Sequence, residues 1–189
     1  ALLREAGLPP DVFEVVVGDG ATGAALLASP IDKLVFTGSV ATGTRVAQAA
    51  GARLLPVVLE LGGKDAMLVL ENADIEVASS AAVWGAFVNA GQACLSVERC
   101  YVHRSLHQKF VARCVDKTRQ LRVGNGLDPE TDIGPLIHQQ QVAIVETQVE
   151  EARARGAQVL LGGERLPHLG PNFYAPTVIT GVDHGMRLM

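Results

Sequence analysis

The chain has 189 residues, of which 48% are hydrophobic and 4% aromatic, and its formal net charge is −4 at pH 7. Its charges are interspersed without a basic block and no apolar run reaches the roughly 18 residues of a membrane span, so we expect neither nucleic acid nor membrane as a partner. Three cysteines without a CxxC pair or a Cys–His cluster argue against a disulfide framework or a metal site and predict a reducing, cytoplasmic compartment.

The first third of the chain alternates β-branched runs with alanine-rich stretches, which predicts strands followed by helices. Pro56 lacks a backbone N–H, so the strand that contains it is predicted to pair only after that residue. Gly51 is expected to end the helix before it. The predicted strands span residues 11–18, 31–38 and 54–63, and the predicted helices span residues 21–29 and 39–52.

The rest of the chain continues this alternation. Asp74 is a suitable N-cap for the next helix, which Gly91 ends, and Ser105 is expected to cap the amphipathic helix that follows. A loop rich in Gly, Asp and Pro covers residues 124–135. The predicted strands span residues 65–71, 98–104, 157–163 and 175–182, and the predicted helices span residues 75–90, 105–121 and about 138–155.

Alternating strands and helices predict an α/β fold with parallel sheets and βαβ crossovers. A domain boundary is expected near Gly62–Gly63, where two predicted strands meet across a flexible joint.

Two glycine-containing turns lie between a predicted strand and a helix. The stretch GDGATG, from Gly18 to Gly23, fits the dinucleotide fingerprint, but no acidic residue ends a strand about 20 residues later. In FTGSVATG, Gly38 permits close backbone approach and Ser39 caps the following helix, whose N-terminus suits a pyrophosphate. An ordinary turn at the first position and an ordinary N-cap at the second remain the alternatives.

Glu60 ends an otherwise apolar strand in the stretch ELGGK. A lone carboxylate is costly to bury, so it should reach a cleft, a partner or solvent. In an apolar cleft it would suit a general base, whereas the alternative is a structural pairing with Lys64 or with a backbone amide.

The three cysteines lie in different local settings. Cys114 is in mid-helix and Cys100 is within a strand, so we expect both to be packed. Cys94 follows NAGQA, a loop after a helix, where backbone N–H groups are free and glycine keeps bulk away. A thiol there can be exposed, and those amides could stabilise its thiolate and a developing oxyanion.

Three of these segments, FTGS, ELGGK and GQAC, closely resemble the aldehyde dehydrogenase superfamily in their order and spacing. Ser39 and Glu60 are 21 positions apart, and Glu60 and Cys94 are 34 apart. The resemblance covers essentially the whole chain, including DPETDIGPLI and the closing YAPTVI. Any one motif is weak, but three at these intervals are highly specific.

The resemblance implies an enzyme that oxidises a small-molecule aldehyde to a carboxylic acid with NAD or NADP. Cys94 would be the nucleophile that forms a thiohemiacetal and then a thioester, and its N–H would supply half of an oxyanion hole. Glu60 would activate the hydrolytic water. The FTGS turn, rather than GDGATG, would hold the pyrophosphate. The cofactor-binding residues implied are Gly18, Gly38, Ser39, Gly43 and Gly62.

The resemblance also predicts the domain organisation. Residues 1–62 would be the C-terminal part of a Rossmann-like NAD(P)-binding domain, and residues 63–189 a truncated catalytic domain. The family's oxyanion-hole Asn, its Lys-x-x-Glu and Glu-x-Phe-Gly-Pro segments and its oligomerisation strands have no counterpart here. We therefore expect an internal fragment with little or no dehydrogenase activity alone, from a full-length homodimer or homotetramer.

Three other functions compete with this interpretation. A CoA-acylating semialdehyde dehydrogenase would release the thioester to CoA, but such relatives typically lack a Glu at the position of Glu60. A non-catalytic structural or binding relative would need neither Glu60 nor Cys94. A plain nucleotide-binding module does not explain the joint spacing of the motifs. Phe87 and Leu95 suggest an uncharged, moderately apolar substrate entry, and the aldehyde itself and the choice of NAD or NADP stay open.

Overall fold

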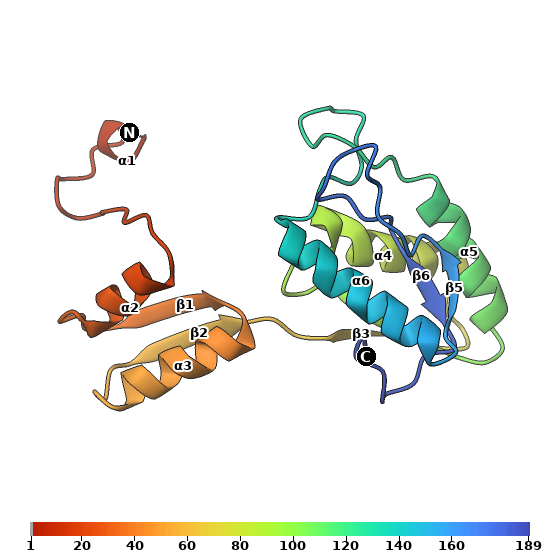
Figure 1. Cartoon of the computed structure of the whole chain (residues 1–189), viewed down its shortest axis with the longest axis horizontal. Coiled ribbons are helices and arrows are strands. Elements are labelled where there is room, and N and C mark those ends of the chain that lie inside the picture. The colour runs from red at the N-terminus through yellow and green to blue at the C-terminus, as the bar shows by residue number, and fades with distance from the viewer. Residues whose placement is uncertain (1) are drawn as a thin grey trace. The chain divides into compact units, whose positions relative to one another are not determined.

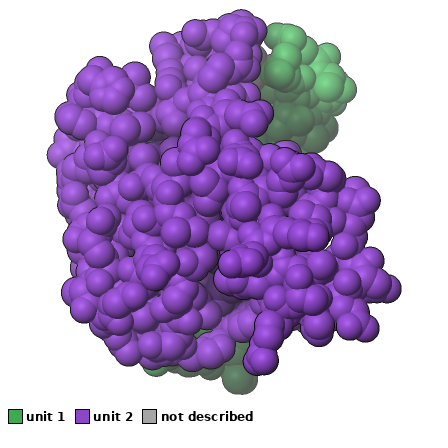
Figure 2. Space-filling model, turned by 90° about the vertical axis from the view of Figure 1, so that its right-hand side faces the viewer, with its two compact units in different colours: residues 1–62 green, residues 63–189 purple. Residues whose placement is uncertain are grey.

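The computed structural model describes residues 2–189 and divides into two compact units. One runs to Gly62 and the other spans Gly63–Met189, as the two colours of Figure 2 show. The division falls at the glycine pair where the sequence suggested a joint. Each unit has its own sheets and helices.

The first unit contains one parallel pair of strands with a helix between them (Figure 1). The pairing runs from Leu34 opposite Val57 to Gly38 opposite Leu61. It begins directly after Pro56, as its missing N–H predicts, and the Pro56 carbonyl accepts a hydrogen bond from the Leu34 N–H at 3.0 Å. The elements are α1 (Leu2–Glu5), α2 (Gly20–Ala28), β1 (Leu34–Gly38), α3 (Val40–Gly51) and β2 (Val57–Leu61).

The strand predicted at residues 11–18 is not formed. The segment has no regular secondary structure, and its valines are exposed, Val17 by 90%. Val, Phe and Ile favour strands because they pack well on a pleated sheet, but a strand also needs a neighbour for its N–H and C=O groups. Within residues 2–62, β1 pairs only with β2, and no strand pairs with residues 11–18.

The second unit holds two further strand pairs and the helices from α4 onward (Figure 1). β3 and β4 pair in parallel, with a bulge between Asp65 and Ala66. β5 and β6 pair in the antiparallel sense. The elements are β3 (Asp65–Val69), α4 (Ile75–Phe87), the 3-10 helix η1 (Val88–Gly91), β4 (Val97–Val102), α5 (His107–Arg119), α6 (Gln139–Ala154), β5 (Gln158–Leu161) and β6 (Val178–Thr180).

The antiparallel pairing of β5 and β6 departs from the predicted parallel arrangement. A parallel pair needs a crossover that carries the chain back to the starting edge, usually through a helix. The connection from residue 162 to residue 177 contains no helix, so the chain returns directly and reverses direction. The parallel prediction therefore fails for this pair, although the α/β class is correct.

Three buried clusters organise the second unit, the smallest of them built from Ala152, Ala157 and Met186, and the two larger ones bear on the site. One joins α4 and α5 to β3 and includes Phe110 at 3% exposure. The other joins α6 to the loops on either side and is built from Leu136, Val142, Val149 and Tyr174. Ala90, in η1, packs against this second cluster. The η1 segment that leads to β4 therefore packs against buried side chains.

Of the two predicted helix caps, Asp74 at the start of α4 is correct and Ser105 at the start of α5 is wrong. Asp74 caps α4, because its Oδ1 accepts hydrogen bonds from the N–H groups of Glu76 at 2.8 Å and Val77 at 3.1 Å. Ser105 does not cap α5, whose N-cap position is Leu106 with no side-chain hydrogen bond. The Ser105 hydroxyl instead lies 2.8 Å from Nδ1 of His103. The Ser105 hydroxyl is therefore bonded to His103 and not to the start of α5.

We predict that Asp74→Ala lowers the free energy of unfolding by about 1 kcal/mol, because two N–H groups at the start of α4 lose their acceptor. Ser105→Ala is the matched control and should change it by less than about 0.5 kcal/mol, since it is exposed and caps nothing. Urea titration of both variants measures this difference. Equal losses for the two variants would contradict the cap assignment.

Candidate functional site

The turn from β1 into α3 presents free backbone donors. Ser39 has extended backbone angles, and its Oγ accepts from the Thr42 N–H at 3.2 Å. The N–H groups of Val40 and Ala41 have no acceptor within residues 2–189. A helix N-terminus of this kind combines unsatisfied donors with the positive end of the helix dipole. It can bind a phosphate or another anion.

Two glycines give this turn its close packing. A Cβ at Gly38 would lie 2.6 Å from the ring of Phe36. A Cβ at Gly43 would lie 2.6 Å from Cδ2 of Leu61, so glycine lets α3 lie directly against β2. The residues present therefore fit a pyrophosphate, which needs bare backbone and short side chains at the helix start.

Arg45 adds a charge to this turn that the sequence motifs did not single out. Its Nη2 donates to Oγ1 of Thr42 at 3.2 Å, and the Ser39 hydroxyl contacts the same oxygen at 3.1 Å. The guanidinium group thus lies within one turn of the helix start, where it favours anions. The three-residue spacing of Thr42 and Arg45 is the pattern that would have found this contact.

The GDGATG turn is less suited to a phosphate. Asp19 caps α2, and its Oδ1 accepts from the Ala21 N–H at 2.9 Å. That carboxylate uses one of the free donors and repels a second anion. A Cβ at Gly18 would collide with Thr22, whereas a Cβ at Gly62 would meet no atom within 4 Å. The cofactor contacts expected of these two glycines stay predictions.

Glu60 lies at the carboxyl end of β2, beside Thr37 on β1. It is exposed and shares a face with Val58. Neither an ion pair nor a side-chain hydrogen bond engages its carboxylate in residues 2–189. Lys64, the structural partner that the sequence allowed, instead pairs with Glu98 on β4 at 2.7 Å. The Glu60 carboxylate is therefore available to accept a proton.

Cys94 lies in the turn between η1 and β4, and its side chain is exposed. Its backbone N–H has no acceptor in the part of the chain that the structure describes. The turn is closed beyond it by Ser96, whose N–H donates to the Ala93 carbonyl at 3.2 Å and whose Oγ donates to the Gly91 carbonyl at 3.1 Å. Ser96 is 2% exposed, so the turn that carries the thiol and its free amide is fixed by a buried, hydrogen-bonded residue.

Comparison with known proteins identifies the family. The sequence profile described as "Aldehyde dehydrogenase family" matches residues 1–189. The chain belongs to the aldehyde dehydrogenase family. The order FTGS, ELGGK and GQAC is therefore correctly interpreted, and the α/β fold class agrees with the structural relatives.

Three relatives show how much of an aldehyde dehydrogenase is present. A Mycolicibacterium smegmatis protein assigned as an NADP(+) succinate-semialdehyde dehydrogenase is 44% identical, with 98% of this chain and 36% of that protein covered. Betaine aldehyde dehydrogenase 2 of Rhizobium meliloti is 43% identical over 99% of this chain and 39% of its own length. The NAD+ complex of a Bacillus cereus aldehyde dehydrogenase superposes with a TM-score of 0.95 at 38% identity, covering 99% of this chain and 38% of that one. The chain thus spans less than two fifths of its relatives' length.

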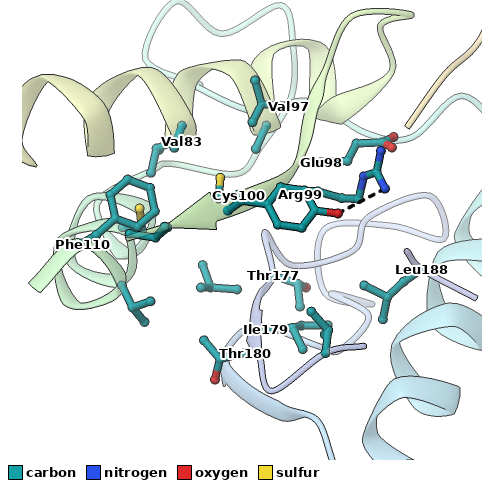
Figure 3. Close-up of a pocket in the computed structure, with 18 of the residues that line it drawn as sticks. Val83, Val97, Glu98, Arg99, Cys100, Phe110, Thr177, Ile179, Thr180 and Leu188 are labelled. Atoms are coloured by element: carbon teal, nitrogen blue, oxygen red, sulfur yellow. Dashed lines mark hydrogen bonds between the residues drawn. The ribbon is translucent and has the colours of Figure 1, made fainter. Parts of the chain in front are cut away.

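The other two thiols of this aldehyde dehydrogenase chain differ from each other. Cys114 is 8% exposed and packs between α4 and α5, as predicted. Cys100 was expected to be packed but is exposed, because it faces a cavity of about 410 Å³ (Figure 3). Partial burial in this recess raises the pKa of the Cys100 thiol. Burial, with a smaller contribution from Cys100, raises the pKa of Cys114 to about 12.

Within residues 2–189 no helix combines the length and the apolar character that crossing a membrane demands. In the same range, no three His, Cys, Asp or Glu side chains gather in a way that could hold a metal ion.

We predict that iodoacetamide at pH 7 alkylates Cys94 first, Cys100 more slowly and Cys114 only after unfolding. The thiolate is the reacting species, and a raised pKa lowers its fraction at any pH below that pKa. The rate at Cys100 should therefore still rise at a pH where a thiol of ordinary pKa, about 8.5, has levelled off. Peptide mass spectrometry across pH 6–11 measures all three rates. Equal labelling of Cys94 and Cys114 in the folded chain would refute this assignment.

Proposed function

We propose that the protein oxidises an aldehyde to a carboxylic acid with NAD or NADP, and that Cys94 is its nucleophile. The observation that carries this proposal is an exposed thiol whose own backbone N–H is free, held in a turn closed by buried Ser96. The names of the relatives, all aldehyde dehydrogenases, support the reaction class.

The first step needs only residues of the second unit. The Cys94 thiolate attacks the aldehyde carbon, a C–S bond forms and the carbonyl oxygen becomes an oxyanion in a thiohemiacetal. The Cys94 N–H has no other acceptor, so it can donate to that oxygen as charge develops. A donor that is already in place pays no reorganisation cost at this moment.

The first unit supplies the cofactor elements in this proposal. The free N–H groups at the start of α3, with Gly38, Ser39 and Gly43 around them, would hold the pyrophosphate, and Arg45 would add a favourable charge. A bound nicotinamide would accept the hydride from the former aldehyde carbon, which leaves a thioester on Cys94. The relatives include proteins named for NADP+ and for NAD+, so we propose either dinucleotide.

Glu60 completes the reaction as general base. Its carboxylate would take a proton from water, and the resulting hydroxide would attack the thioester carbon. The C–S bond then breaks, the carboxylic acid leaves and the Cys94 thiolate is restored. Its exposure and lack of a structural partner support this role. In the same proposal, residues 1–62 are the C-terminal part of a Rossmann-like cofactor domain and residues 63–189 belong to a catalytic domain.

The nucleophile can be tested without a cofactor, using p-nitrophenyl acetate. The thiolate attacks the acetyl carbon, p-nitrophenolate leaves, and an acetyl thioester remains on Cys94. We expect a burst of p-nitrophenolate near one equivalent per chain, with the acetyl group found on Cys94 by mass spectrometry. Cys94→Ser should abolish the burst, whereas Cys114→Ser should retain it. A full burst from Cys94→Ser would refute the assignment.

The base is tested by the decay of the same acyl-enzyme. Glu60→Gln should leave the burst intact and slow thioester hydrolysis by about 100-fold or more, the usual contribution of a general base. Thr37→Val, which alters the neighbouring strand position, is the control and should keep the normal decay. An unchanged decay in Glu60→Gln would remove Glu60 from the mechanism and leave the role of Cys94 standing.

A further inference from the structure

The turn that leads to Cys94 has a backbone that most residues avoid. Asn89 has φ 53° and ψ 34°, Ala90 has φ 57° and ψ 33°, and Gly91 has φ 73°. Three successive residues are thus left-handed. Glycine adopts this conformation freely and Asn tolerates it, but the Cβ of alanine crowds the following carbonyl. Something outside the turn must therefore hold Ala90 in place.

The Gln92 side chain supplies such a restraint from both of its amide atoms. Its Nε2 donates to the Asn89 carbonyl at 3.1 Å, and the Asn89 side-chain Nδ2 donates back to the Gln92 carbonyl at 3.0 Å. Its Oε1 accepts from the backbone N–H of Ile137 at 2.9 Å. One side chain thus closes the turn on itself and ties it to a segment 45 positions away.

The segment at Ile137 is a firm attachment point. Its neighbour Leu136 is 8% exposed, belongs to the cluster with Tyr174 and donates its N–H to the Asn172 carbonyl at 2.9 Å. Ala90 packs against the same cluster. The left-handed turn is therefore held at two points on one packed base, by the methyl group of Ala90 and by the amide of Gln92.

We propose that Gln92 is a positioning residue for the Cys94 backbone N–H. By holding the left-handed turn against the buried cluster that contains Leu136 and Tyr174, it fixes the direction of the free Cys94 amide that stabilises the oxyanion. This inference rests on the proposed role of Cys94 as nucleophile. The hydrogen bonds of the Gln92 side chain go to Asn89 and Ile137 and not to the thiol, so it acts through the turn.

Two reactions of the same thiol separate positioning from simple exposure. Acylation by p-nitrophenyl acetate passes through an oxyanion and depends on a well-placed amide. Alkylation by iodoacetamide displaces iodide at a saturated carbon, develops no oxyanion and depends on thiolate fraction and access. The ratio of the two rates at Cys94 therefore reports the amide, and Cys100 alkylation in the same molecule is an internal reference.

The test compares Gln92→Met, which keeps the length of the side chain but loses its hydrogen bonds to the Asn89 carbonyl and the Ile137 N–H, with Gln120→Met as control. Gln120 is an exposed glutamine at the end of α5, away from the turn. We expect Gln92→Met to lower the acylation rate about tenfold or more while alkylation of Cys94 changes less than about twofold. The control should alter neither rate. An unchanged ratio of acylation to alkylation in Gln92→Met would overturn the proposal.

Alkylation of the buried thiol guards against general misfolding in the same samples. Unfolding of Gln92→Met would expose Cys114 and raise its alkylation rate, whereas loss of positioning alone should leave Cys114 unlabelled. A fall in acylation matched by an equal fall in Cys94 alkylation, with Cys114 still protected, would also overturn the proposal. Loss of the burst in unsubstituted protein would instead contradict the nucleophile, and the two failures are thereby distinguishable.

Discussion

A nucleophilic thiol must be open to its substrate while the backbone beside it stays fixed, and the turn before β4 meets both demands. The polypeptide leaves α4, passes through three left-handed residues and reaches Cys94 with the thiol exposed. Side chains on both sides of the thiol, Gln92 and Ser96, bond to backbone carbonyls within the turn. Exposure of the sulfur and rigidity of its support therefore come from different atoms.

The parallel pairing in the first unit imposes a comparable arrangement. Parallel strands end at the same edge of a sheet, so the turn after β1, which we propose binds the pyrophosphate, and Glu60 near the end of β2 are neighbours. Gly43 lets α3 pack closely enough for this edge to form. The N-terminus of α3, which attracts an anion, and the Glu60 carboxylate, which can accept a proton, thus lie at one edge of the sheet.

The sequence predicted features that depend on local chemistry. Pro56 set the start of a strand because it lacks an N–H, and Asp74 set the start of a helix because its carboxylate reaches two N–H groups. Features that depend on a distant neighbour were missed. Residues 11–18 have strand-forming side chains but no partner strand, and Cys100 is in a strand as predicted yet faces a cavity. The contact between Gln92 and Ile137 was missed because it joins residues 45 positions apart, a pairing that motif spacing does not display.

The unpaired apolar segment at residues 12–17 has a consequence for the behaviour of the chain in solution. It carries four valines, one phenylalanine and a single charge at Glu14, and contains no proline. Its side chains are exposed and its backbone donors and acceptors are unpaired with another strand. Such a segment is a template for intermolecular β-pairing. The same segment of a second copy can pair with its backbone N–H and C=O groups in register. Self-association through β-structure is thus a property of residues 12–17 in the first unit, whereas all three thiols belong to the second unit.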